Sequence, residues 1–178
     1  MNNFFKVFVG FIFFFLNFGY SFAQDDGKIW VFKIGSTQDE VSIAIKQLKN
    51  NGICNDPSSG FDFFTKKPSI GCRHESYKLE FLSLPIKKSS FNFNSKSERL
   101  SDIEFWFGFP KEGETRARFQ SLVRDMERIS GQQAIVSVDE DKVGNQVKYA
   151  RVRTPSFNIT LREEATFGPF MVFWKTID

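Results

Sequence analysis

The sequence has 178 residues, a formal net charge of +3 at pH 7 and an aromatic content of 17%, including 24 phenylalanines. This length suits one domain with a substantial core, and the nearly balanced charge gives no case for nucleic acid as a partner. After the first segment, no apolar run is long enough to cross a membrane as a helix.

The N-terminal segment is typical of a secretory signal peptide. Lys6 supplies a positive charge, residues 7–16 are almost wholly apolar, and the small residues Ser21 and Ala23 suit signal peptidase. We therefore predict that residues 1–23 are removed and that residues 24–178 form a single domain, periplasmic or secreted. The alternative is an uncleaved membrane anchor, but residues 4–23 are barely long enough to span a bilayer and end in polar residues.

The next segment predicts a strand followed by a helix. Residues 28–34 are rich in β-formers, and Gly35 ends them. Thr37 and Glu40 have the spacing of a capping box, and Asp39 adds an acid to the first helical turn. The helix ends at residues 50–52, and its apolar stripe recurs at helical spacing as Val41, Ala44, Ile45 and Leu48.

Residues 33–41, KIGSTQDEV, combine three features. A strand ends in glycine, a capped helix begins, and an apolar residue follows the acidic turn. This stretch resembles the repeat of β-lactamase-inhibitor-like proteins and of small outer-membrane assembly lipoproteins. The chain departs from that pattern because no Gly-x-Pro turn follows the helix and no lipid-anchor cysteine is present. The resemblance implies a small exported α+β module that binds another protein, and it transfers no functional residue.

The two cysteines of the chain, Cys54 and Cys72, favour a disulfide, because an exported chain with an even cysteine count usually pairs them. Such a bridge stabilises the fold by roughly 3 kcal/mol. The alternative, free or metal-bound thiols, is disfavoured by the single histidine of the chain. We predict a long surface loop between the cysteines, in which Phe61, Phe63 and Phe64 either cover the edge of the core or form an exposed binding patch.

The middle of the chain predicts two strands with a polar connection. Alternating apolar residues indicate strands at residues 77–84 and 100–109, and residues 86–99 read as a broad, partly mobile hairpin connection. In the second strand Phe105 and Phe107 share a face with Ile103 and Phe109. Trp106 takes the opposite face, where it lies either under a second layer or exposed for binding.

Residues 115–131 form the best-defined helix of the sequence. Gly131 suits a left-handed cap at its end. The helix cannot stand alone in water, so we expect its apolar face to pack on strands. That face is formed by Phe119, Leu122, Val123, Met126 and Ile129.

Four strand-like segments follow, at residues 134–138, 147–152, 157–161 and 170–177, and their short connections favour an antiparallel meander. The predicted order is β-α-β-β-α-β-β-β-β. This order indicates an α+β fold in which two helices pack on an antiparallel sheet. Each helix precedes strands, which suggests two degenerate α-then-strands units without a strict residue-level repeat.

No catalytic, metal or cofactor motif is apparent in the sequence. His74 is the only histidine, so a Ser-His-acid triad would have to use it; otherwise it is a half-exposed residue beside the disulfide. His74-Glu75 begins like a zinc-protease motif, but Lys78 stands where the second histidine ligand is needed. The acidic residues 139–141 lack EF-hand spacing and suit a solvated hairpin tip.

These observations lead us to expect a non-enzymatic exported module that uses no cofactor or metal. Its sheet face around Trp106, or its disulfide loop, would contact a protein partner in the envelope or outside the cell. The rival hypotheses are a secreted hydrolase that uses His74 and a structural protein of the cell envelope. The partner and the oligomeric state are left open.

Overall fold

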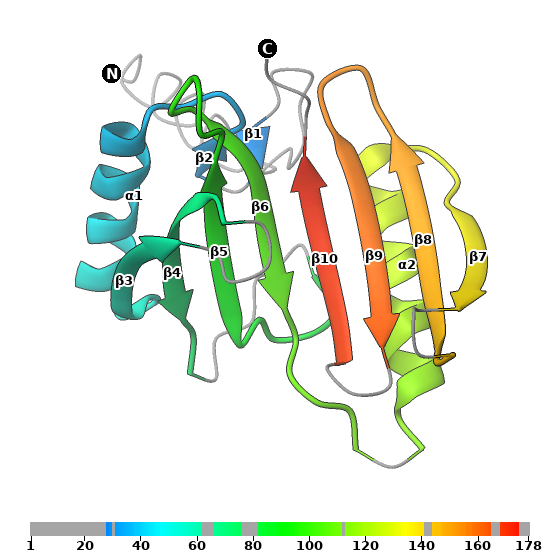
Figure 1. The fold of residues 1–178 in the computed structure, drawn as a ribbon. Coiled ribbons are helices and arrows are strands. Elements are labelled where there is room, and N and C mark those ends of the chain that lie inside the picture. Colours follow the sequence, from blue (N-terminus) through cyan, green and yellow to red (C-terminus); the bar gives the residue numbers. More distant parts are fainter. Residues whose placement is uncertain are drawn as a thin grey trace, which may run out of the picture.

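The computed structural model describes residues 28–29, 31–61, 66–75, 82–111, 113–140, 144–164 and 168–174 (Figure 1). The predicted signal peptide lies outside these ranges. In the part described, two helices and an eight-stranded antiparallel sheet make up the fold, which confirms the α+β class. Neither helix is both long and apolar enough to cross a membrane. In chain order the elements are β1 (Lys28–Ile29), β2 (Phe32–Lys33), α1 (Gln38–Asn50), β3 (Asn55–Phe61), β4 (Pro68–Arg73), β5 (Lys88–Phe93), β6 (Leu100–Trp106), α2 (Thr115–Ser130), β7 (Ile135–Glu140), β8 (Gln146–Arg153), β9 (Asn158–Glu164) and β10 (Gly168–Trp174).

The large sheet has the strand order β3-β4-β5-β6-β10-β9-β8-β7, so two four-stranded meanders meet at its centre (Figure 1). One helix precedes each meander, which gives two α-then-four-strands units in the described chain. The central strands β6 and β10 carry similar runs, residues 103–106 (IEFW) and 171–174 (MVFW). Their register pairs Glu104 with Val172, Phe105 with Met171 and Ile103 with Phe173. The pairing of these two strands is therefore symmetric about the Glu104–Val172 pair, which places a local pseudo-two-fold axis there.

The two predicted helices are confirmed, and local chemistry explains their ends. Thr37 Oγ1 accepts a hydrogen bond from the Glu40 N–H at 3.3 Å, and Glu40 Oε2 accepts one from the Thr37 N–H at 2.8 Å, so the capping box begins α1. Gly131 has a φ of 66° and closes α2 with a left-handed cap. The hydrophobic core includes residues from both apolar stripes: Val41, Ile45, Leu48, Phe119, Leu122 and Met126.

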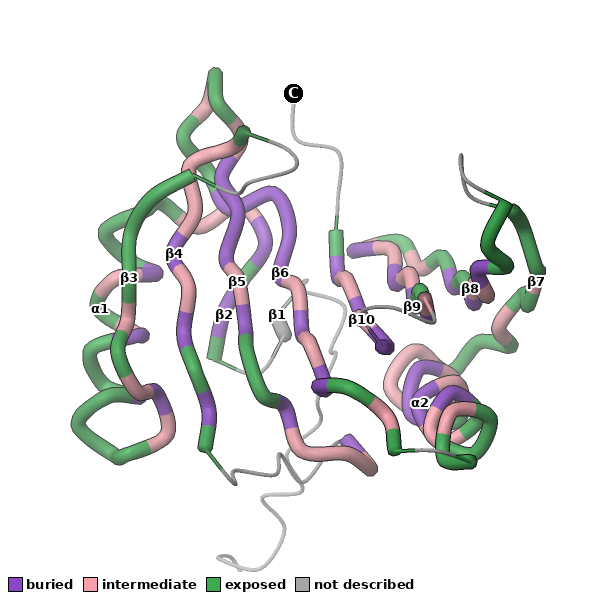
Figure 2. The backbone as a smooth tube through the Cα atoms, turned by 60° about the horizontal axis from the view of Figure 1, so that its bottom comes forward, coloured by how far each residue is buried: buried purple, intermediate pink, exposed green. Residues whose placement is uncertain are grey.

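The second helix contacts β8, β9 and β10, and it lies behind β8 and β9 in the view of Figure 1. Figure 2 shows the same arrangement from another direction, with the buried turns of α2 toward these strands. On the strands, buried Ile159, Leu161 and Phe173 alternate with less buried residues. The sheet therefore has one face in the core and one face turned away from α2.

A close backbone approach marks the end of the central strand pair. Gly168 has a φ of 73°, and a Cβ at this position would lie 2.5 Å from the Gly108 carbonyl oxygen. The Phe107 N–H donates to the Pro169 carbonyl at 3.3 Å beside it. Only glycine fits position 168, so the seam between β6 and β10 depends on it.

Three predictions of local structure are wrong. Residues 28–34 are not one strand: β1 and β2 form a hairpin in which Lys28 pairs with Lys33, because β-propensity does not fix strand length. The predicted loop at residues 54–72 contains the paired strands β3 and β4. The predicted polar connection at residues 86–99 contains β5, whose Phe91 and Phe93 are buried in the core. Most of the predicted strand at residues 77–84 lies outside the described residues, and its described end, residues 82–84, is not in a strand.

Candidate functional site

A row of aromatic and cationic side chains crosses the sheet face that is turned away from α2. Trp106 on β6 pairs with Phe170 on β10 and with Lys88 on β5. Phe170 pairs in turn with Arg162 on β9, which pairs with Tyr149 on β8. Directly paired residues of antiparallel strands lie on the same face of a sheet. These five residues therefore form one line across five strands, which we call the open-face row.

Two rings flank Trp106 and shape the centre of the row. The Phe109 ring stands edge-on to Trp106 at 5.3 Å, and the Phe170 ring lies 6.4 Å from it. Phe109 is exposed, whereas Trp106 and Phe170 are half-buried. The prediction that Trp106 lies on the face opposite Phe105 is confirmed. The prediction that Phe109 shares the buried face of Phe105 is wrong, because Phe109 is exposed. The three rings give the row an apolar centre that solvent reaches.

The position of Phe109 is fixed from α2. Arg118 Nη1 donates to the Phe109 carbonyl at 2.8 Å, and Nη2 donates to the carbonyls of Phe107 and Gly108. A guanidinium that binds three successive carbonyls holds this segment with charge-assisted hydrogen bonds. The loop after β6 is therefore held in place beside Trp106.

The other end of the row is cationic. The Arg151 guanidinium lies 4.6 Å above the Tyr149 ring and the Arg162 guanidinium lies 5.9 Å from it, both within cation–π range. Arg162 also pairs with Glu164, and Arg151 lies 3.9 Å from Asp139. Both arginines are exposed, so their guanidinium groups remain accessible to a ligand.

The predicted disulfide between Cys54 and Cys72 is present, with a Cα–Cα distance of 5.5 Å. Both cysteines are buried, and the bridge ties the start of β3 to β4. Phe61 ends the edge strand β3 and is exposed, but β4 and β5 separate it from Trp106. Phe63 and Phe64 lie outside the described residues. The sheet thus does not bring Phe61 and Trp106 into one site.

His74 is buried, not half-exposed, and both of its ring nitrogens have partners. Nδ1 lies 2.7 Å from the Ile53 carbonyl oxygen, and Nε2 lies 2.8 Å from Ser89 Oγ. A carbonyl only accepts, so Nδ1 carries the proton and Nε2 accepts from the Ser89 hydroxyl. Burial lowers the pKa of His74, although the hydrogen bond to Ile53 acts in the opposite direction. His74 therefore joins the turn before β3 to β5 as a neutral residue.

Sequence reasoning identified only Trp106 among the members of the row. Lys88, Tyr149, Arg162 and Phe170 are distant in sequence, and only the strand register aligns them. No family model, curated protein or solved structure matches this chain.

Proposed function

We propose that this protein is an exported, non-enzymatic module that binds another protein through its open-face row. The observation that carries the proposal is the register that aligns Lys88, Trp106, Phe170, Arg162 and Tyr149 on one sheet face. Tryptophan, tyrosine and arginine are the residue types that contribute most to protein–protein binding energy. A solvent-accessible line of these residues is therefore suited to recognition.

The chemistry of the row defines the partner surface. Aromatic centres at Trp106 and Phe170 would receive apolar side chains, while Lys88, Arg162 and Arg151 would pair with carboxylates. The partner is thus a protein surface with an apolar centre that acidic residues flank.

Rigidity of the row supports this function as well. Arg118 fixes the backbone at Phe109 beside the row, and the sheet fixes the backbone of the five row residues. Little backbone conformational entropy is therefore lost when a partner docks on the row. Export is supported by the N-terminal pattern and by the Cys54–Cys72 bridge, since disulfides persist in oxidising compartments.

The rival hydrolase hypothesis draws on the 2.8 Å contact between His74 and Ser89. A nucleophilic serine must reach its substrate, but Ser89 and His74 are both buried in the folded chain. The pair therefore has the geometry of a structural hydrogen bond, and we favour binding over hydrolysis.

Affinity capture from the native envelope tests the proposal. The purified protein serves as bait beside four folded variants: Trp106→Ala and Arg162→Glu in the row, and Phe61→Ala and Lys46→Glu as aromatic and charge controls away from it. The captured partner, identified by mass spectrometry, is then titrated against each variant. We expect the row variants to weaken binding at least about 10-fold and the controls to leave it unchanged. If only Phe61→Ala weakened partner binding, the binding site would lie on the β3–β4 hairpin, which would contradict the proposal.

A further inference from the structure

The two edge strands of the sheet differ in their protection against pairing. The edge strand β3 is interrupted by a bulge between Asn55 and Ser58, contains Pro57, and has a positive φ at Asp56. Its counterpart β7 is continuous with β8 from residue 135 to residue 140, and within the described chain β8 is its only strand partner. Bulges and prolines are devices that keep sheet edges from pairing. The structure protects one edge in this way and not the other.

Strand β7 exposes β-branched side chains on both of its faces. Ile135 is 76% exposed, Val136 54% and Val138 55%. Val136 and Val138 share one face, because they pair with Ala150 and Lys148 on β8. This strand combines an unpaired edge with apolar surface, which is the usual requirement for strand addition.

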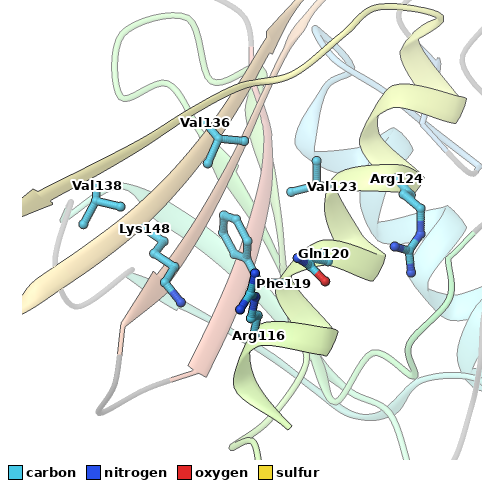
Figure 3. A pocket seen from close by; sticks show the side chains of 8 residues that line it. All are labelled: Arg116, Phe119, Gln120, Val123, Arg124, Val136, Val138 and Lys148. Atoms are coloured by element: carbon cyan, nitrogen blue, oxygen red, sulfur yellow. The ribbon is translucent and has the colours of Figure 1, made fainter.

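A groove runs between β7 and α2 along the face of Val136 and Val138 (Figure 3). Its volume is about 740 Å³, and Phe119 and Val123 of α2 line the side opposite the valines. Arg124 and Lys148 also line the groove. The groove therefore offers apolar contact surface beside the unpaired strand edge.

We propose that this edge pairs with β7 of a second copy of the chain. The charge distribution along the strand favours a copy as the occupant, because β7 ends in the acidic residues Asp139 and Glu140, while cations of β8 lie beside its start. Arg151 pairs there with Ile135 in the strand register, although its guanidinium lies 3.9 Å from Asp139 of its own chain. Arg153, two residues further on β8, adds a second exposed cation near that end. Antiparallel pairing sets the acidic end of each strand against the basic end of the other.

A two-fold axis at Ser137 gives the register of this pairing. Val136 then lies opposite Val138 of the second copy, so the exposed valines cover one another beside the two grooves. Asp139 lies opposite Ile135 of the second copy, next to the strand position of Arg151 and near Arg153. The pairing joins two sheets at a strand of six residues, so we expect a reversible dimer, not a permanent one.

Sedimentation equilibrium over a concentration series tests the proposal with the full chain, expressed with its own N-terminal segment. We expect a monomer–dimer equilibrium for the parent protein. Val136→Lys places a charge on the pairing surface and should raise the dimer Kd at least about 10-fold. Val31→Lys is the matched control, because Val31 is an exposed valine outside the large sheet, and it should leave the Kd unchanged.

A charge exchange tests the register, and circular dichroism of each variant checks that the intrachain contact between Asp139 and Arg151 is not needed for folding. Asp139→Arg should weaken the dimer, and the added substitution Arg153→Asp should restore part of the lost affinity. A parent protein that stays monomeric at high concentration would overturn the proposal, and so would a dimer that is indifferent to Val136→Lys. Failure here leaves the open-face row untouched, because the row lies on the sheet face and not at its β7 edge.

Discussion

Replacing Glu163 with glutamine tests the cost of a charge on the core side of the sheet. Glu163 is 3% exposed, and neither carboxylate oxygen accepts a hydrogen bond from any described residue. Lys148 Nζ lies 3.9 Å from Oε2, which is too long for a hydrogen bond. Burial therefore raises the pKa of Glu163 above its usual value of 4.5, and the charges of Lys148 and Arg118 oppose this rise only in part.

The expected magnitude follows from this environment. Leaving a buried polar group without a hydrogen bond costs about 1–3 kcal/mol, and a charged group costs more than a neutral one. Lys148 is 40% exposed, so it stays solvated when the charge of Glu163 is removed. The glutamine amide is also left without a hydrogen bond, so only the extra cost of the charge is removed. We expect Glu163→Gln to raise the free energy of unfolding by about 1 kcal/mol at pH 7, with a Tm increase of roughly 2–4 °C per kcal/mol.

The sign of the pH dependence is also fixed. A raised pKa means that the folded state binds the proton of Glu163 more tightly than the unfolded state does. The parent protein therefore loses stability as the pH rises above about 4.5 and through the folded pKa. Urea unfolding should show a small stability gain for Glu163→Gln at pH 4 and a larger gain at pH 7. The substitution Glu75→Gln at an exposed position is the control and should leave the stability unchanged at both pH values. A Glu163→Gln variant less stable than its parent at pH 7 would refute the reasoning.

Three further predictions concern the core. Cys54→Ser should lower the free energy of unfolding by roughly 3 kcal/mol under oxidising conditions, measured by urea unfolding, and a reductant should bring the parent protein close to the variant. Because burial lowers the pKa of His74, the parent should lose stability as the pH falls below about 6.5, and His74→Asn should lack this slope in melts between pH 7 and pH 5. Met126→Asp should leave the chain unfolded by circular dichroism, because Met126 is fully buried on α2; an unchanged melting curve would remove α2 from the core.

Local chemistry explains which parts of the fold were predictable from sequence. The capping box at Thr37 and the left-handed cap at Gly131 act within one helical turn. The sequence therefore predicted both α1 and α2 with nearly correct ends. The meander from β7 to β10 was also predicted, because apolar and polar residues alternate along its strands and its connections are short. These elements depend on neighbours in the chain.

The missed strands depend on distant partners. The run NDPSSGF of β3 is poor in β-formers, and its extended form comes from pairing with β4 across the Cys54–Cys72 bridge. The polar residues of β5 made it resemble a loop, yet Ser89 bonds His74 and Asn92 bonds Asp102 inside the fold. The open-face row was missed for the same reason, since cross-strand register is set by tertiary structure.

The seam between β6 and β10 has a consequence for how the chain could be divided. A cut in the connection between Phe109 and Glu114 would divide the chain into two fragments, each with one helix and one four-stranded meander. Each fragment would then carry one central strand, β6 or β10, that has lost a strand partner. Those two inner strands match, since Ile103 meets Phe173 and Phe105 meets Met171 in the intact chain. The two fragments would therefore expose strand edges that are complementary in register and in side chains, as expected for a sheet built from two joined halves.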